Sequence, residues 1–99
     1  MYIIREVLSC KPGKVRQLVD RFRTLSGAVQ ATGRAPLRLL TDVSGERFWT
    51  LIVEASVETV DEFFTMEQSL RGNEAVGKAM AGYHELVESG RREIYRIES

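Results

Sequence analysis

His84 is the only histidine of this sequence and the side chain best suited to acid–base chemistry near neutral pH. It follows Tyr83 and several small residues in the segment AMAGYHELV. A histidine can act as a general base or a ligand, and a nearby tyrosine can donate a hydrogen bond to a developing oxyanion. We therefore predict His84 and Tyr83 as candidate catalytic residues. The alternative is a boundary histidine that is hydrogen-bonded to the backbone or to water.

A small-molecule site also needs apolar walls and a few placed polar groups. Trp49, the only tryptophan, is expected in the core of a central strand, or with Tyr83 on the wall of a cleft between helices and sheet. Phe64 and Met80 are further apolar candidates for contact with a ligand. Arg38 is the candidate for binding an anion, with a structural salt-bridge network as the alternative.

The sequence contains no motif typical of a metal site or of a cofactor-binding site. The single cysteine, Cys10, cannot form an internal disulfide and provides no metal-ligand spacing. No glycine-rich phosphate loop precedes a helix. We expect no metal and no resident cofactor.

Composition narrows the class of protein. Fourteen basic residues balance 14 acidic ones, which argues against a nucleic-acid partner because binding phosphates requires a cationic excess. No apolar run approaches the roughly 20 residues of a membrane span, and the first ten residues do not have the pattern of a signal peptide. We expect one cytoplasmic domain over residues 1–99 with no membrane partner.

The first half of the chain predicts a strand, a helix and a hairpin. Residues 2–10 have the β-branched and aromatic composition of a strand, which Pro12-Gly13 ends. Apolar residues then recur at intervals of three and four from residue 14, which predicts an amphipathic helix that ends near Gly33. Residues 36–43 and 47–55 are two strands joined through Ser44-Gly45.

The second half predicts two helices and a last strand. Ser56 is the expected N-cap of a helix whose apolar face is Val57, Val60, Phe63, Phe64 and Leu70. Arg71-Gly72-Asn73 interrupts this helix, and Asn73 can cap a further helix that ends at Gly90. Residues 92–98 form the last strand. The order predicts a ferredoxin-like βαββαβ fold of the α+β class, a four-stranded antiparallel sheet with helices on one face.

One face of this sheet is left without helices. The side predicted to face the helices carries Leu37, Leu39, Val43, Trp49, Leu51, Val53, Tyr95 and Ile97. The open side carries Ile4, Glu6, Leu8, Arg38, Leu40, Asp42, Phe48, Thr50, Ile52, Ile94 and Arg96. The phase of the first strand stays open, since both Ile3/Val7 and Ile4/Leu8 alternate. So many apolar residues on an open face predict a homodimer that packs two sheets face to face.

The pattern of the whole chain resembles the dimeric α+β barrel superfamily, and within it the NIPSNAP-like proteins and the antibiotic-biosynthesis monooxygenases. The resemblance rests on the first strand leading into KPGK, the long helix, RFWTLIVEA, GYHELV and the short last strand. It implies a cofactor-independent monooxygenase or isomerase acting on a small aromatic or polyketide-like compound, with His84 as base and Tyr83 or Arg38 as donor. A non-catalytic dimer that binds a small molecule or a protein is the alternative.

Two other activities fit the sequence less well. Haem-degrading members of this superfamily use an Asn on the first strand, a Trp on the second helix and a His further along. Here the first strand has no Asn, and of these three residues only the His has a counterpart, His84. A haem-binding protein is therefore the third alternative. An RNA-binding βαββαβ module needs a basic–Gly–aromatic signature on its third strand, which GERFWTLIVEA lacks.

Overall fold

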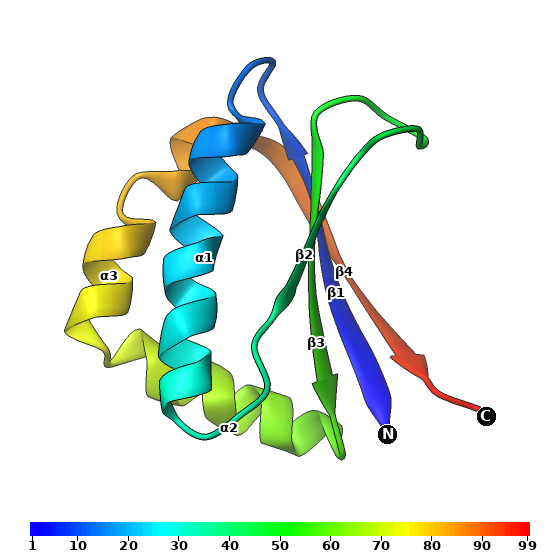
Figure 1. The fold of residues 1–99 in the computed structure, drawn as a ribbon, viewed down its shortest axis with the longest axis vertical. Helices are drawn as coiled ribbons and strands as arrows, with labels where there is room; N and C mark the ends of the chain where they lie inside the picture. The colour runs from blue at the N-terminus through cyan, green and yellow to red at the C-terminus, as the bar shows by residue number, and fades with distance from the viewer.

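Four strands pair into one antiparallel sheet in the order β2-β3-β1-β4 (Figure 1). The computed structural model describes residues 1–99. The strands are β1 (Tyr2–Cys10), β2 (Arg38–Thr41), β3 (Thr50–Val57) and β4 (Val87–Arg96). The helices are α1 (Val15–Ala31), α2 (Val60–Arg71), α3 (Glu74–Met80) and a 3-10 turn, η1 (Tyr83–Leu86). The predicted ferredoxin-like α+β fold is confirmed.

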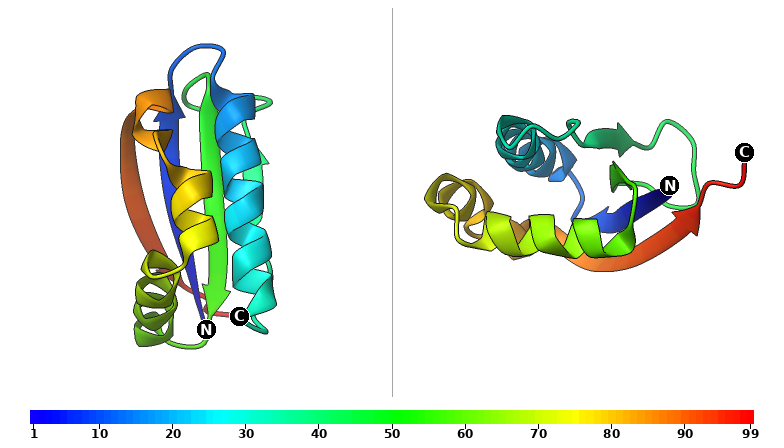
Figure 2. Two further views of the ribbon diagram at one scale, coloured as in Figure 1. Left: turned by 90° about the vertical axis from the view of Figure 1, so that its left-hand side faces the viewer. Right: turned by 90° about the horizontal axis from the view of Figure 1, so that it is seen from below.

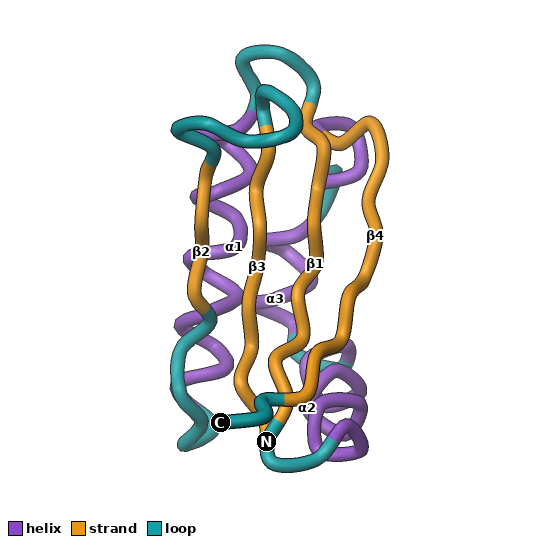
Figure 3. The backbone as a smooth tube through the Cα atoms, turned by 90° about the vertical axis from the view of Figure 1, so that its right-hand side faces the viewer, coloured by secondary structure: helices purple, strands orange, loops and turns teal.

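All the helices cover the same face of the sheet, so the molecule has two layers (Figure 2). α1 and α3 run side by side along the sheet, and α2 lies across one end of it (Figure 1). Figure 3 shows the opposite face of the sheet, which no helix covers. None of the helices is both long enough and apolar enough to cross a membrane.

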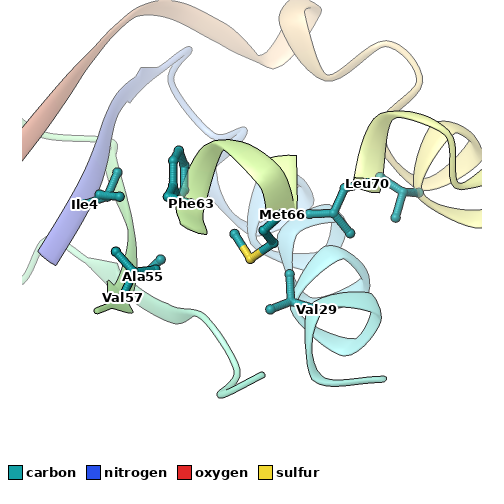
Figure 4. Close-up of a cluster of buried hydrophobic side chains, with 8 residues drawn as sticks. Ile4, Val29, Ala55, Val57, Phe63, Met66 and Leu70 are labelled. Atoms are coloured by element: carbon teal, nitrogen blue, oxygen red, sulfur yellow. The ribbon is translucent and has the colours of Figure 1, made fainter. Parts of the chain in front are cut away.

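The core lies between the two layers and consists of two clusters. The first joins the α2 end of the sheet to the helices and contains Ile4, Val29, Ala55, Val57, Phe63, Met66, Leu70 and Val76 (Figure 4). The second contains Cys10, Leu18, Val19, Phe22, Leu51, Val53 and Leu86. Leu18, Phe22 and Val29 come from the apolar stripe that predicted α1. Gly33 follows that helix with a φ of 89°, which favours glycine, as expected for a C-terminal stop.

Register decides the phase of β1 and corrects the predicted phase of β4. Ile4 pairs with Ala55 of β3 and with Ile94 of β4, so all three point toward the helices. The phase of β1, which the sequence left open, is thus the one in which Ile4, Glu6 and Leu8 face the helices rather than the open side. Tyr95 is opposite Ile3 on the open face, so the predicted phase of the last strand is wrong. The phases of β2 and β3 are confirmed, with Leu51 and Val53 buried.

The chain around α2 and α3 differs from the prediction at three points. Thr59, not Ser56, is the N-cap of α2, because its side chain accepts a hydrogen bond from the Glu62 amide at 3.1 Å. Asn73 caps α3 as predicted. That helix ends at Met80 rather than at Gly90, and η1 leads directly into a β4 that starts at Val87. Gly90 lies inside the strand, so it ends no helix.

The loop between β2 and β3 is longer than the short loop through Ser44-Gly45 that the sequence predicts. β2 ends at Thr41 and β3 begins at Thr50, where the backbone amide donates to the Asp42 carboxylate at 2.8 Å. Val43 and Phe48 are exposed in this loop. Asp42 therefore anchors the end of the loop instead of extending the strand.

Candidate functional site

A cavity of about 370 Å³ lies between the helices and the sheet, and 13 of its 17 lining residues are hydrophobic. Central strands provide one wall, with Ile4 and Val53 among its residues. The helices provide the other, with Phe22 from α1 and Met66 from α2. The volume is in the range of small-molecule sites. The cavity is therefore the candidate binding site.

Three charged side chains form a connected group at this cavity. Arg92 of β4 contacts Glu6 of β1, its neighbour in register, and donates to Oε2 of Glu67 on α2 at 2.7 Å. Its guanidinium also lies 5.0 Å from the ring centroid of Phe63. Burial acts to lower the pKa of Arg92, but the hydrogen bonds to Glu6 and Glu67 outweigh it and raise that pKa. This Glu6–Arg92–Glu67 triad is the polar part of the cavity lining.

The 3-10 turn brings the predicted catalytic pair to the edge of the cavity. Tyr83 lines the cavity, as does Met80 at the end of α3. His84 does not belong to the lining; it is exposed, and its ring centroid is 6.0 Å from that of Tyr83. A haem ligated by His84 would therefore lie outside this cavity.

Arg21 of α1 holds this turn in place. Its Nη1 donates to the carbonyl oxygens of Ala79 and Ala81, at 3.1 and 2.7 Å. These carbonyls lie at the C-terminal end of α3, where backbone acceptors have no helical partner. One side chain of the longest helix thus fixes the corner that leads from Met80 to Tyr83.

The other predicted ligand-binding residues lie elsewhere. Trp49 is 44% exposed in the β2–β3 loop and has a φ of 60°, so its predicted place in the core is wrong. Its carbonyl accepts a hydrogen bond from the Cys10 amide at 2.8 Å. Phe64 does not line the cavity and is 42% exposed. Arg38 is on the open face, 3.6 Å from Glu54. Of the six residues, the structure brings only Tyr83 and Met80 into the cavity.

Three residues of the site escaped the sequence reading: Phe63 as a platform for a cation, Glu67 and Arg92. Glu6 was noticed but assigned to the wrong face. The available signal was the occurrence of one acid among the apolar residues of β1 and of three arginines in β4. Pairing them requires the β1–β4 register, which no local pattern contains.

Cys10 and the remaining acidic groups add no second chemical site. Burial raises the pKa of the Cys10 thiol, which makes it a poor nucleophile. No group of three or more His, Cys, Asp or Glu side chains is placed to hold a metal ion. Within the cavity between helices and sheet, the polar chemistry open to a ligand comes from the triad, Arg71 and Tyr83.

The sequence matches no protein-family model and no curated protein. Solved structures with the same fold include an uncharacterised NIPSNAP domain protein from Burkholderia xenovorans, with a TM-score of 0.79 and 14% identity over 100% of this chain and 96% of that one. A NIPSNAP family protein from Agrobacterium tumefaciens has a TM-score of 0.77 and 18% identity, covering 97% and 92%. A candidate antibiotic biosynthesis monooxygenase from Nitrosomonas europaea has a TM-score of 0.75 and 13% identity over both full chains.

These likenesses define the class of fold to which the chain conforms. It has the ferredoxin-like α+β fold of the NIPSNAP and antibiotic biosynthesis monooxygenase structures. The resemblance predicted from the sequence is confirmed at the level of the fold. At identities below 20%, the activity of the chain has to be argued from its own site.

Proposed function

We propose that this chain binds a small, largely apolar compound, aromatic or polyketide-like, in the cavity between helices and sheet. The observation that carries the proposal is an apolar cavity of about 370 Å³ with a polar triad on one side of its lining. Phe22, Phe63 and Met66 offer aromatic and sulfur surfaces suited to flat ligands. The polar end of the ligand would lie at Arg92.

The enzymatic form of this proposal is a cofactor-independent monooxygenase or isomerase. Either reaction starts with the removal of a proton from an acidic carbon or phenol, which leaves an enolate or phenolate. Glu6 is the lining carboxylate on a central strand and is our candidate acceptor, while Arg92 would stabilise the anion. Return of the proton to another carbon completes an isomerisation. Reaction of a methylene anion with dioxygen gives a carbonyl, and the second oxygen atom leaves as water.

Non-catalytic binding of the same compound is the alternative. It fits the ion-paired state of the triad, in which Glu6 and Glu67 already share Arg92. A binding protein needs the cavity and the triad as recognition groups, without a free base. Measurement of product formation from a bound compound distinguishes the enzyme from the non-catalytic binding protein.

We also propose that the chain is a homodimer that uses the open face of the sheet as its contact. The predicted cytoplasmic location stays a prediction.

A thermal-shift screen of hydroxylated bicyclic and tricyclic aromatics tests the binding proposal. We expect a rise in Tm that grows with ligand concentration. Leu25 lines the cavity from α1, so Leu25→Trp should fill it and abolish the shift, while Leu25→Met keeps the volume and the shift. A shift that survives Leu25→Trp places the ligand outside the cavity.

Oxygen uptake and product mass, measured without added cofactor, test the enzymatic form. Glu6→Gln should abolish turnover and leave the thermal shift of the hit compound in place. His84→Ala serves as the comparison, because His84 lies beside Tyr83 but outside the lining. Loss of turnover in His84→Ala with normal turnover in Glu6→Gln would return the role of base to His84. Binding without turnover would leave the non-catalytic alternative.

A further inference from the structure

The charged residues that line the cavity form one connected chain. They are Glu6, Arg92, Glu67 and Arg71. Arg92 joins Glu6 to Oε2 of Glu67. Oε1 of Glu67 in turn lies 3.5 Å from Nη2 of Arg71, one helical turn further along α2. The other lining side chains are apolar except for the hydroxyl of Tyr83. A bound compound therefore meets charged partners along this one chain of side chains.

The two ends of the chain of charges differ in what they offer a ligand. Glu6 lies on the central strand β1 and uses only Oε1 for Arg92, so Oε2 is an acceptor without a partner. At the other end, Arg71 is the last residue of α2, and its side chain is 74% exposed. The side chains of Glu6 and Glu67 are only 28% and 29% exposed. The cavity thus has a hydrogen-bond acceptor on the sheet and a guanidinium next to solvent.

Arg71 is the lining cation whose donors are least satisfied. Arg92 makes two hydrogen bonds, whereas the guanidinium of Arg71 makes none and has only the ion pair with Glu67. An exposed pair of this kind between residues one turn apart on a helix is weak. A guanidinium presents five N–H donors in a planar fork that matches the two oxygens of a carboxylate. Arg71 is therefore placed to bind a carboxylate that arrives from solvent.

We infer that the compound bound in the cavity is an aromatic acid whose carboxylate pairs with Arg71. The inference rests on the proposed function, to which it adds an anionic group and the residue that selects it. The ring lies among the apolar side chains of the lining, and the hydroxyl or acidic carbon at its far end lies at Glu6. Because charge-assisted hydrogen bonds are about twice as strong as neutral ones, Arg71 favours the acid over an uncharged compound of the same shape.

The same charges disfavour the other ionic classes of ligand. A cationic group would approach the guanidinium of Arg71, while the carboxylates of Glu6 and Glu67 are already bonded to Arg92. A dianion such as a phosphate monoester would hold its second negative charge beside Glu67, and like charges at short range repel. A monoanion with two oxygens in a plane is the class that fits.

Isothermal titration calorimetry with a matched pair of probes tests this inference. The acid probe is a naphthalene with a hydroxyl group on one ring and a carboxyl group on the other, and its primary amide has the same shape without the charge. The acid is ionised at neutral pH. We expect the wild type to bind it at least about tenfold more tightly than the amide. Arg71→Gln should abolish this preference by weakening binding of the acid alone, and Arg71→Lys should retain part of it.

Arg23→Gln is the matched control for the substitution of Arg71. Arg23 is also an exposed helical arginine with one ion pair to an acid of its own helix, Asp20, but it does not line the cavity. This variant should therefore keep the full preference for the acid. Since neither arginine is buried, both variants should fold as the wild type does, which circular dichroism verifies.

The other outcomes separate failure of this inference from failure of the proposed function. Equal binding of acid and amide, with both lost in Leu25→Trp, would overturn the inference and leave the cavity as the binding site. A preference for the acid that persists in Arg71→Gln and disappears in Arg92→Met would overturn the role of Arg71. Binding of neither probe, with a neutral compound from the thermal-shift screen still bound, would overturn the inference alone. Absence of all binding would overturn the proposed function with it.

Discussion

The guanidinium of Arg92 lies over the ring of Phe63, 5.0 Å from its centroid, and so joins the last strand to α2. The same guanidinium bonds Glu67 of α2 and Glu6 of β1. One side chain thus connects an edge strand, its neighbouring strand and a helix at the candidate site.

Replacement of Arg92 by methionine should lower the free energy of unfolding by about 1–2 kcal/mol, from two partly exposed ion pairs and one cation–π contact. Methionine retains much of the apolar stem, so the loss reports the charge. Urea unfolding measures it. Arg23→Met is the matched control, because Arg23 makes a single exposed pair with Asp20. That variant should stay within about 0.5 kcal/mol of the wild type. Equal losses in the two variants would mean that the triad contributes nothing specific.

The side chain of Leu8 on the neighbouring strand leaves little room for a side chain at Gly90. A Cβ atom at position 90 would lie 2.9 Å from Cδ2 of Leu8. Gly90→Ala should therefore destabilise the protein by about 1 kcal/mol through overpacking. In a Leu8→Ala background the same substitution should cost less, and a double-mutant cycle measures the difference. Strict additivity would show that the clash is not the cause.

Gly27→Ala is the matched control for this prediction. Gly27 lies in α1, where nothing is within 4 Å of an added Cβ. There alanine should stabilise the protein by about 0.5–1 kcal/mol through helix propensity. The same substitution is thus expected to have opposite signs at the two glycines.

The corrected start of α2 predicts which hydroxyl supports the helix. Thr59→Ala should cost about 1 kcal/mol, because the Glu62 amide loses its acceptor, while Thr59→Ser should keep most of the stability. Ser56→Ala, at the position that the sequence favoured, should change stability by less than about 0.5 kcal/mol. Thermal unfolding followed by circular dichroism ranks the three variants. A larger loss of stability in Ser56→Ala than in Thr59→Ala would show that Ser56 is the N-cap of α2, as the sequence predicted.

Cys10 predicts a pH dependence of stability. Burial raises the pKa of its thiol, so between the unfolded and folded pKa values the folded chain holds the proton that the unfolded chain has lost. The contribution of this thiol to the free energy of unfolding is therefore fully present below about pH 8.5, the ordinary thiol pKa. It is lost as the pH rises through the folded pKa. The slope of unfolding free energy against pH should be steeper for the wild type than for Cys10→Ala in this range. Equal slopes in the wild type and in Cys10→Ala would show that the pKa of the Cys10 thiol is not raised in the folded chain.

The predictable part of the fold is the part in which one sequence phase is clearly more apolar than the other. Leu51, Val53 and Ala55 form one wholly apolar phase of β3, whereas the other phase also carries Thr50 and Glu54, so the orientation of this strand could be predicted directly. β1 has Ile3 and Val7 in one phase and Ile4 in the other, and both Ile4 and Val7 are buried, on opposite faces. Local pattern cannot decide such a strand, because the answer depends on its partners.

The end of the last helix was misread for a related reason. Met80, Tyr83 and Val87 continue a helical spacing, so Gly90 looked like a helix stop. The chain instead turns at Gly82, whose φ is 75°, and enters the strand at Val87. Pairing of β4 with all nine residues of β1 outweighed the weak propensity for another helical turn. The site was hidden for another reason: Arg92 lies within the predicted last strand, but it is opposite Glu6 only in the observed β1–β4 register.

Successive residues of β1 and β4 carry opposite charges on opposite faces. Arg5 faces Glu93 on one side of the sheet, and Glu6 faces Arg92 on the other. If β4 shifted by one residue in one direction, Arg5 would lie opposite Arg92; a shift in the other direction would set Glu6 opposite Glu93. Among these three alignments, only the observed one matches both charges. These four residues therefore destabilise a β4 that pairs one residue out of register with β1 while the chain folds. This effect does not depend on a bound ligand or a second copy.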